Sequence, residues 1–127
     1  KYVYDHGICP KTELVVETLG GDKYLTLNVK DGKVFEVTVD MGEPELTSEL
    51  PEKIHVNGED REFVGISVGN PHAVYFTEEI DGLDLEKIGP AYENHERFPN
   101  RVNSEFIELV SRDHIRMRVW ERGSGET

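Results

Sequence analysis

Two polar side chains interrupt an apolar strand pattern in this sequence. From Val64 to Phe76 the even-numbered positions are otherwise apolar, but Asn70 and His72 fall among them. If the strand pattern continues through Gly69 and Pro71, an amide and an imidazole face the interior. Each then costs about 1–3 kcal/mol unless it is hydrogen-bonded. The alternative is a turn in this segment, in which Asn70 favours the turn and His72 is exposed.

A second pattern is interrupted by Glu121. Ile115, Met117 and Val119 share one face of a predicted strand, and Glu121 is next on that face. Burial at the rim of a core would raise the pKa of this carboxyl group and suit it to proton transfer or to coupling with another titrating group. The alternative is that Glu121 leaves the strand into solvent. Arg122 could pair with Glu121 or bind a ligand carboxylate through its guanidinium.

A third polar cluster lies in the loop that precedes a predicted strand beginning at Ser104. It contains Asn100, Arg101 and Asn103. Asparagines in such loops commonly cap turns, which is the simplest interpretation of the cluster. The sequence has no HExxH, CxxC, GxGxxG or GxSxG motif, and its five histidines are scattered. Zinc, dinucleotide and hydrolase sites therefore have no support, and we expect no metal site.

Composition narrows the class of protein. The 127 residues are 36% hydrophobic and carry a net charge of −12, which disfavours binding to nucleic acid or to an anionic membrane surface. No apolar run reaches the ~18 residues needed to span a bilayer, and the N-terminus does not resemble a signal peptide. The single cysteine, Cys9, excludes an internal disulfide. We therefore expect a globular, cytoplasmic protein.

The elements that position these residues are mainly strands. Residues 1–7 predict the end of a helix closed by Gly7, without a beginning for that helix. Strands are predicted in ranges separated by glycine-rich or polar turns, whereas 43–53, with two prolines and several glutamates, predicts an irregular surface connection. A short helix begins after Asp84, the expected N-cap, and is limited by Pro90. The predicted strands are 12–18, 24–29, 34–41, 62–68, 104–110 and 114–120.

Four segments in this order resemble the diaminopimelate epimerase family: VTVDMGEP, VGNPHAVYF, GPAYENHERFPNRVNSEFIE and IRMRVWERGSGET. The resemblance extends over essentially the whole sequence. KYVYDHG is similar to the segment that follows the family's first catalytic cysteine motif, and ERGSGET to the segment that precedes the second. The first thiol is therefore expected upstream of Lys1, and Cys9 is interpreted as an incidental loop residue.

The resemblance implies a cofactor-independent enzyme that interconverts LL- and meso-diaminopimelate with two cysteines, on the route to lysine and peptidoglycan. One thiolate removes the α-proton and the other thiol supplies a proton to the opposite face, so their proton affinities must be tuned. The family assigns this tuning to positions that correspond to His72 and Glu121. By the same correspondence Asn70, Asn103, Glu121 and Arg122 bind the substrate, chiefly at its unreactive end.

The family's fold implies an α+β, mainly antiparallel structure of two lobes, each a curved sheet around a central helix. Residues 1–30 would be the C-terminal part of the first lobe and 31–127 the N-terminal part of the second. Three apolar faces, in 35–41, 64–76 and 115–119, would then lack a partner, so we expect the isolated polypeptide to aggregate. Because it contains neither catalytic thiol, we also expect it to be inactive alone.

Two alternatives remain open. One is a sibling amino-acid racemase of the same fold, such as a proline-racemase-like enzyme. The other is a noncatalytic β-rich binding module built on this scaffold. A small-molecule substrate is expected in the first case, and a homodimer is compatible with the sequence, which does not determine the oligomeric state.

Overall fold

The computed structural model describes all 127 residues as two compact units, Lys1–Glu43 and Pro44–Thr127. The boundary between lobes predicted after Lys30 stays a prediction. The strand Lys33–Asp40 pairs with Gly21–Lys30 and so belongs to the first unit. No helix has the length and apolar character that crossing a membrane requires.

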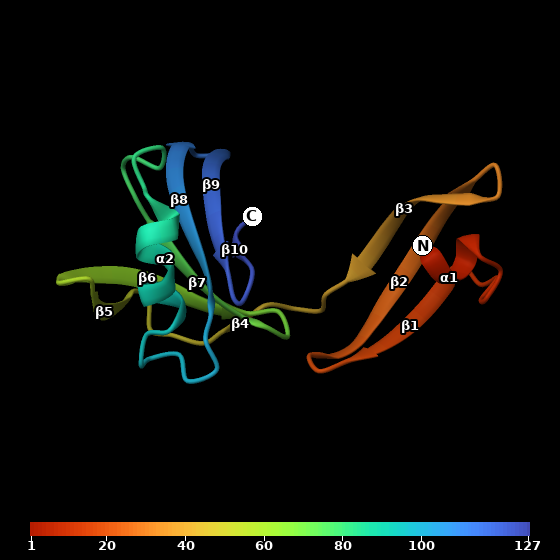
Figure 1. Cartoon of the computed structure of the whole chain (residues 1–127), viewed down its shortest axis with the longest axis horizontal. Helices are drawn as coiled ribbons and strands as arrows, with labels where there is room; N and C mark the ends of the chain where they lie inside the picture. Colours follow the sequence, from red (N-terminus) through yellow and green to blue (C-terminus); the bar gives the residue numbers. More distant parts are fainter. The chain divides into compact units, whose positions relative to one another are not determined.

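The first unit is a three-stranded antiparallel sheet with one short helix (Figure 1). Helix α1 (Tyr2–Asp5) precedes strands β1 (Glu13–Thr18), β2 (Gly21–Lys30) and β3 (Lys33–Asp40), which lie in the order β1-β2-β3. These elements confirm the predicted helix end and the three predicted strands. Cys9 lies in the loop after α1 and is half-buried.

The turn between β2 and β3 shows why the sequence forms a hairpin here. Asp31 and Gly32 both have left-handed backbone angles, φ 51° and 73°. Two such residues form the tight turn whose twist matches paired strands, and Asp-Gly is a preferred pair for it. Nearby, Asp5 at the end of α1 accepts a hydrogen bond from the Val34 backbone N–H at 2.9 Å. This contact fixes the helix to β3.

The first unit buries little apolar surface. Its only buried hydrophobic side chains are Leu27 and Val34. Four side chains were predicted to share the apolar face of a half-buried strand: Phe35, Val39 and Met41 are 67%, 41% and 43% exposed, and Val37 is half-buried. The strand is therefore more exposed than half-buried, and the expected unpartnered apolar face is present.

The second unit is built on a seven-stranded mixed sheet. Its strands are β4 (Glu45–Leu46), β5 (Glu52–Val56), β6 (Glu59–Ser67), β7 (Pro71–Phe76), β8 (Asn103–Ser111), β9 (His114–Glu121) and β10 (Gly125–Glu126). The order is β10-β9-β8-β7-β6-β4, and β5 also pairs with β6. All pairs are antiparallel except β7 and β8, which run parallel and are connected through helix α2 (Leu85–Glu93).

Three short strands, β4, β5 and β10, lie where no strand or only an irregular connection was expected. β4 pairs with the end of β6, and β5 pairs with its beginning through the Asn57-Gly58 turn. Charged residues are common on such edges because they discourage pairing with other chains. Because the segment 43–53 is rich in glutamate, its composition predicted an irregular connection instead of strands.

The core of this unit lies on the opposite face of the sheet from the one expected. Phe63, Ala73, Tyr75 and Phe106 are buried in one cluster with residues of α2. The even-numbered residues of β6 and β7, such as Val64, face the side of the sheet away from α2. The even-numbered apolar pattern of 64–76 was real, but the odd-numbered positions of β6 and β7 form the packed core because α2 covers that side.

Helix α2 packs closely on β9. The predicted N-cap is confirmed, because the Asp84 side chain accepts a hydrogen bond from the Lys87 backbone N–H at 3.3 Å. The helix continues through Pro90 for nine residues in total. At Gly89 an added Cβ would lie 2.2 Å from the Trp120 ring, so only glycine allows this approach of the helix. Trp120 is consequently buried, although it shares its face of β9 with the polar residues Arg116 and Arg118.

Candidate functional site

The face of the larger sheet that α2 does not cover carries polar side chains from three neighbouring strands. His72 on β7 is aligned with Asn103 on β8, and Ser104 is aligned with Trp120 on β9. By the same register Asn103 is next to Glu121. Because aligned residues of neighbouring strands point to the same face, His72, Asn103 and Glu121 form a row across the sheet.

A cavity of about 380 Å³ lies over this row. All five side chains that the sequence analysis assigned to the site line it: Asn70, His72, Asn103, Glu121 and Arg122. Glu105, Met117 and Val119 complete the lining. The residues come from three segments, 70–72, 103–105 and 117–122, which the pairing of β7 with β8 and of β8 with β9 brings together.

Neither simple interpretation of the Gly69–His72 segment is complete. A turn connects β6 to β7 at residues 68–70, with Gly69 at φ 96°. Asn70 therefore lies in a turn, as one of the two interpretations predicted. His72, however, belongs to β7 and its side chain is 26% exposed. It faces the same side as Ile66, with which it is aligned. The interrupted pattern therefore did indicate a partly buried imidazole.

Asn103 holds the chain at the end of β9. Its side chain is buried, and its Oδ1 accepts a hydrogen bond from the Arg122 backbone N–H at 2.8 Å. This contact fixes the start of the terminal loop beside the cavity. Only the amide NH₂ of Asn103 remains as a donor for a ligand, which suits a carboxylate oxygen.

Glu121 and Arg122 do not pair with each other. The Glu121 carboxylate accepts a hydrogen bond from the Thr127 hydroxyl at 3.1 Å, and the Arg122 guanidinium donates to the Asn100 carbonyl at 3.2 Å. Both residues are exposed, so Glu121 leaves the strand at the rim of the cavity and is not buried in a core. Arg122 has no ion pair, and its guanidinium keeps donors for an anionic ligand.

Glu105 is a member of the site that the sequence analysis missed. Its Oε1 lies 2.5 Å from Nδ1 of His72, and the residue is 8% exposed. Burial raises the pKa of Glu105, while the hydrogen bond and charge of His72 act in the opposite direction. The available signal was its spacing, because Glu105 is two residues beyond Asn103 on the same strand and so shares its face.

Glu93, at the end of α2, was missed as well. It is 5% exposed and accepts three hydrogen bonds: from the Arg101 guanidinium at 2.9 Å, from the Trp120 indole at 2.8 Å and from the Gly123 backbone N–H at 3.0 Å. A buried carboxylate is tolerated when its oxygens are satisfied in this way. Glu93 therefore joins the helix, the Asn100–Asn103 loop and the terminal loop behind the site.

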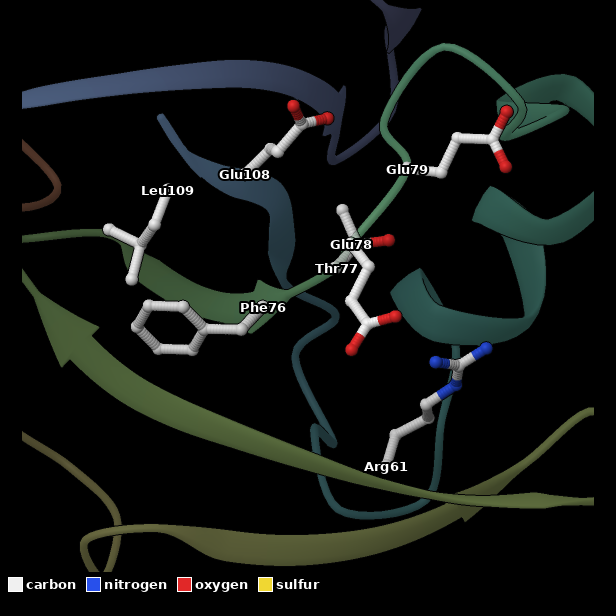
Figure 2. Close-up of a pocket in the computed structure, with 7 residues that line it drawn as sticks. All are labelled: Arg61, Phe76, Thr77, Glu78, Glu79, Glu108 and Leu109. Atoms are coloured by element: carbon white, nitrogen blue, oxygen red, sulfur yellow. The ribbon is translucent and has the colours of Figure 1, made fainter. Parts of the chain in front are cut away.

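A larger cavity of about 860 Å³ lies elsewhere in the same unit (Figure 2). In Figure 2 its apolar residues Phe76 and Leu109 lie on one side and Arg61 on the other, with three glutamates around it. None of the residues predicted for the site lines it. One of the glutamates, Glu108, already accepts a hydrogen bond from the Ile80 backbone N–H. The smaller cavity is therefore the better candidate. No group of three His, Cys, Asp or Glu side chains is arranged to hold a metal ion.

Comparison with known proteins decides the family. The family model described as diaminopimelate epimerase matches residues 64–127, which include every residue of the smaller cavity. The chain belongs to the diaminopimelate epimerase family. Proteins named diaminopimelate epimerase from Agathobacter rectalis and Desulfovibrio desulfuricans are each 48% identical to it, and one from Methanococcus maripaludis is 46% identical. All of this chain is aligned, but only 50–51% of each relative, so it spans about half their length.

Solved structures support the fold of this member of the diaminopimelate epimerase family. A probable proline racemase from Agrobacterium radiobacter matches with a TM-score of 0.71, and a hydroxyproline epimerase from Agrobacterium vitis with 0.70. The sequence identities are 16% and 18%, and each match covers 98% of this chain and 43% of the other. The mainly antiparallel α+β class predicted from sequence is thereby confirmed.

Proposed function

We propose that this sequence is the internal part of a diaminopimelate epimerase, between its two catalytic cysteine motifs. The full-length protein would interconvert LL- and meso-diaminopimelate without a cofactor, with one thiol on each side of the reacting carbon. One observation carries the proposal. The five side chains that the family resemblance assigns to the site, although distant in sequence, line a single cavity.

The site residues divide into two roles. His72 and Glu121 adjust when each thiol holds or releases its proton, which proton transfer near neutral pH requires. Asn70, Asn103 and Arg122, with Glu121, bind the unreactive amino-acid end of the substrate. Its carboxylate suits the Arg122 guanidinium and the Asn103 NH₂ group, and its ammonium suits carboxylate and amide oxygens. A wrong stereocentre would leave such groups unpaired, which is a strong basis for discrimination.

Residues 1–30 and 31–127 would contribute to the first and second lobes of the enzyme. The 127-residue polypeptide itself would be inactive, since neither thiol is within it. The expected setting is cytoplasmic, with a small-molecule substrate and without nucleic acid or membrane partners. A homodimer is the simplest assembly to test, by light scattering of the full-length protein.

The test uses the full-length protein and measures epimerisation and exchange of the α-hydrogen of diaminopimelate with solvent. Glu121→Gln and His72→Asn should lower kcat by about 100-fold or more and shift its pH profile, because each removes a titrating group near the thiols. Arg122→Leu should chiefly raise KM, by about 10- to 100-fold, because a charged hydrogen bond is worth about 1.5–3 kcal/mol. Arg112→Leu, in the turn between β8 and β9, is the matched control.

Wild-type kinetics in all three variants would remove the site assignment. The sibling-racemase alternative is tested by competition between diaminopimelate and proline. Turnover of proline in preference to diaminopimelate would favour the sibling racemase. A full-length protein that contains both thiols but turns over neither substrate would favour the noncatalytic module.

A further inference from the structure

Glu105 and His72 form a hydrogen-bonded pair in the floor of the site. The two residues lie on the parallel strands β7 and β8, where His72 is aligned with Asn103 and Glu105 is the next residue of β8 on the same face. The 2.5 Å separation of Oε1 and Nδ1 places one proton between them. Both side chains line the cavity, and that of Glu105 is only 10% exposed.

This contact determines which ring nitrogen of His72 can act. A carboxylate only accepts hydrogen bonds, so it selects the imidazole tautomer that carries its proton on Nδ1. The other nitrogen, Nε2, then presents a lone pair. Nε2 is buried and has no hydrogen-bond partner within the chain. A buried acceptor of this kind needs a donor from elsewhere, either another part of the protein or a ligand.

We propose that Glu105 is a positioning residue that holds His72 with its proton on Nδ1 and thereby presents Nε2 to the site as a hydrogen-bond acceptor. The inference rests on the proposed function, in which the donor to Nε2 is a catalytic thiol. Glu105 itself does not touch the substrate. It acts through His72, as an orienting carboxylate does for a histidine base in other enzymes.

The charges around the pair are consistent with this role. Glu121 and Arg122, from the end of β9, are the other charged groups of the cavity. Glu121 adds repulsion that disfavours the Glu105 carboxylate, whereas His72 favours it through its hydrogen bond. A carboxylate that is costly to bury and is held by a single side chain fits a role in orienting that side chain better than a role in packing.

The first measurement is the tautomer of His72. Long-range nitrogen NMR of the full-length protein labelled with ¹⁵N-histidine reports which ring nitrogen carries the proton, and His72→Asn identifies the signal. We expect protonated Nδ1 and unprotonated Nε2 in the wild type. Glu105→Leu should move the proton to Nε2, the form that a free imidazole prefers, whereas Glu105→Gln should retain Nδ1–H because its amide oxygen still accepts.

The second measurement is steady-state kinetics of the same variants. Glu105→Leu should lower kcat by about 10-fold or more with KM changed by less than about twofold, and Glu105→Gln should recover much of the loss. Glu108→Gln is the matched control, because Glu108 lies on the same strand but on the opposite face and also accepts a hydrogen bond. It should change neither the tautomer nor kcat.

Each result decides the proposal. A wild-type His72 with its proton on Nε2 would overturn it without any variant, even if Glu105→Leu failed to fold. An unchanged tautomer in Glu105→Leu, or a changed tautomer with unchanged kcat, would overturn it as well. If the wild-type protein did not epimerise diaminopimelate, the proposed function would fail while the NMR result still decided the role of Glu105 toward His72.

Discussion

Single carboxylates in this unit are kept buried in two different ways. Glu93 accepts three hydrogen bonds, which involve both of its carboxylate oxygens. Glu105 has one hydrogen-bond partner, and its Oε2 has none. The first arrangement stabilises the fold around the terminal loop. The second leaves a carboxyl group whose burial disfavours ionisation, and this cost is offset chiefly by the hydrogen bond and charge of His72.

The raised pKa of Glu105 predicts a dependence of stability on pH. From the usual value of 4.5 up to the raised pKa of the folded state, the native protein holds a proton that the unfolded chain has released. Stability from this group therefore decreases as pH rises through that window. Glu105→Gln removes the titration. Across this pH range, the melting temperature of the full-length wild type should fall relative to that of the variant as pH rises. A constant difference between the two melting temperatures would contradict the prediction.

Sequence patterns predicted some residues of the candidate site and missed others for a physical reason. Asn70, His72 and Glu121 were visible because each replaces an apolar residue in an alternating series. Glu105 and Glu93 were not, because a glutamate in a charged sequence is normally exposed. Their burial depends on partners, such as Arg101 and His72, that only the folded chain brings close.

At the level of elements, the contact between α2 and β9 sets the shape of the second unit. Its closeness depends on Gly89, since a Cβ there would overlap the Trp120 ring. The helix ends at Glu93, whose carboxylate holds both Trp120 and Gly123. The position of α2 is therefore transmitted directly to the loop that borders the cavity.

Gly89→Ala tests this contact. Alanine favours a helix by about 1 kcal/mol over glycine, but overpacking typically costs about 1–3 kcal/mol, and an overlap at 2.2 Å forces the helix or the ring to move. We expect a net loss of stability in denaturant unfolding, with a changed Trp120 fluorescence. Gly82→Ala is the control, because its Cβ would meet only the flexible Glu79 side chain. Equal or greater stability of Gly89→Ala would show that the contact is loose.

The elements were predicted well where turn residues mark their ends. Asp31-Gly32 and Asn57-Gly58 both adopt the left-handed angles expected of such pairs. The strands β4 and β5 were missed because their stability comes from pairing with β6 and not from their own sequence. The choice of core face also escaped prediction, since both faces of β6 and β7 are apolar and α2 decides between them.

For the molecule as a whole, exposed apolar surface is the dominant feature. In the first unit Phe35 is 67% exposed, and in the second Phe76, Ile115 and Met117 are 56%, 50% and 54% exposed. Soluble proteins rarely leave such side chains grouped on one sheet face without a partner. These faces are where the remaining half of a full-length relative is expected to pack.

We therefore expect the isolated 127-residue polypeptide to aggregate or to unfold without a sharp transition. Calorimetry and light scattering of the purified chain measure both properties. The full-length protein is the comparison and should melt cooperatively. A monomeric chain with a single sharp transition would contradict this prediction and would mean that the apolar faces are stable in water.

The parallel pairing of β7 and β8 carries one further consequence, for changes in chain length. The strand period of two assigns alternate residues of β8 to the cavity and to the core. Inserting one residue at the beginning of β8 would exchange these assignments, turning Phe106 toward the cavity and Glu105 toward Trp120. Such an insertion would replace the buried carboxylate in the floor of the cavity with an aromatic ring, although the composition of the strand would hardly change.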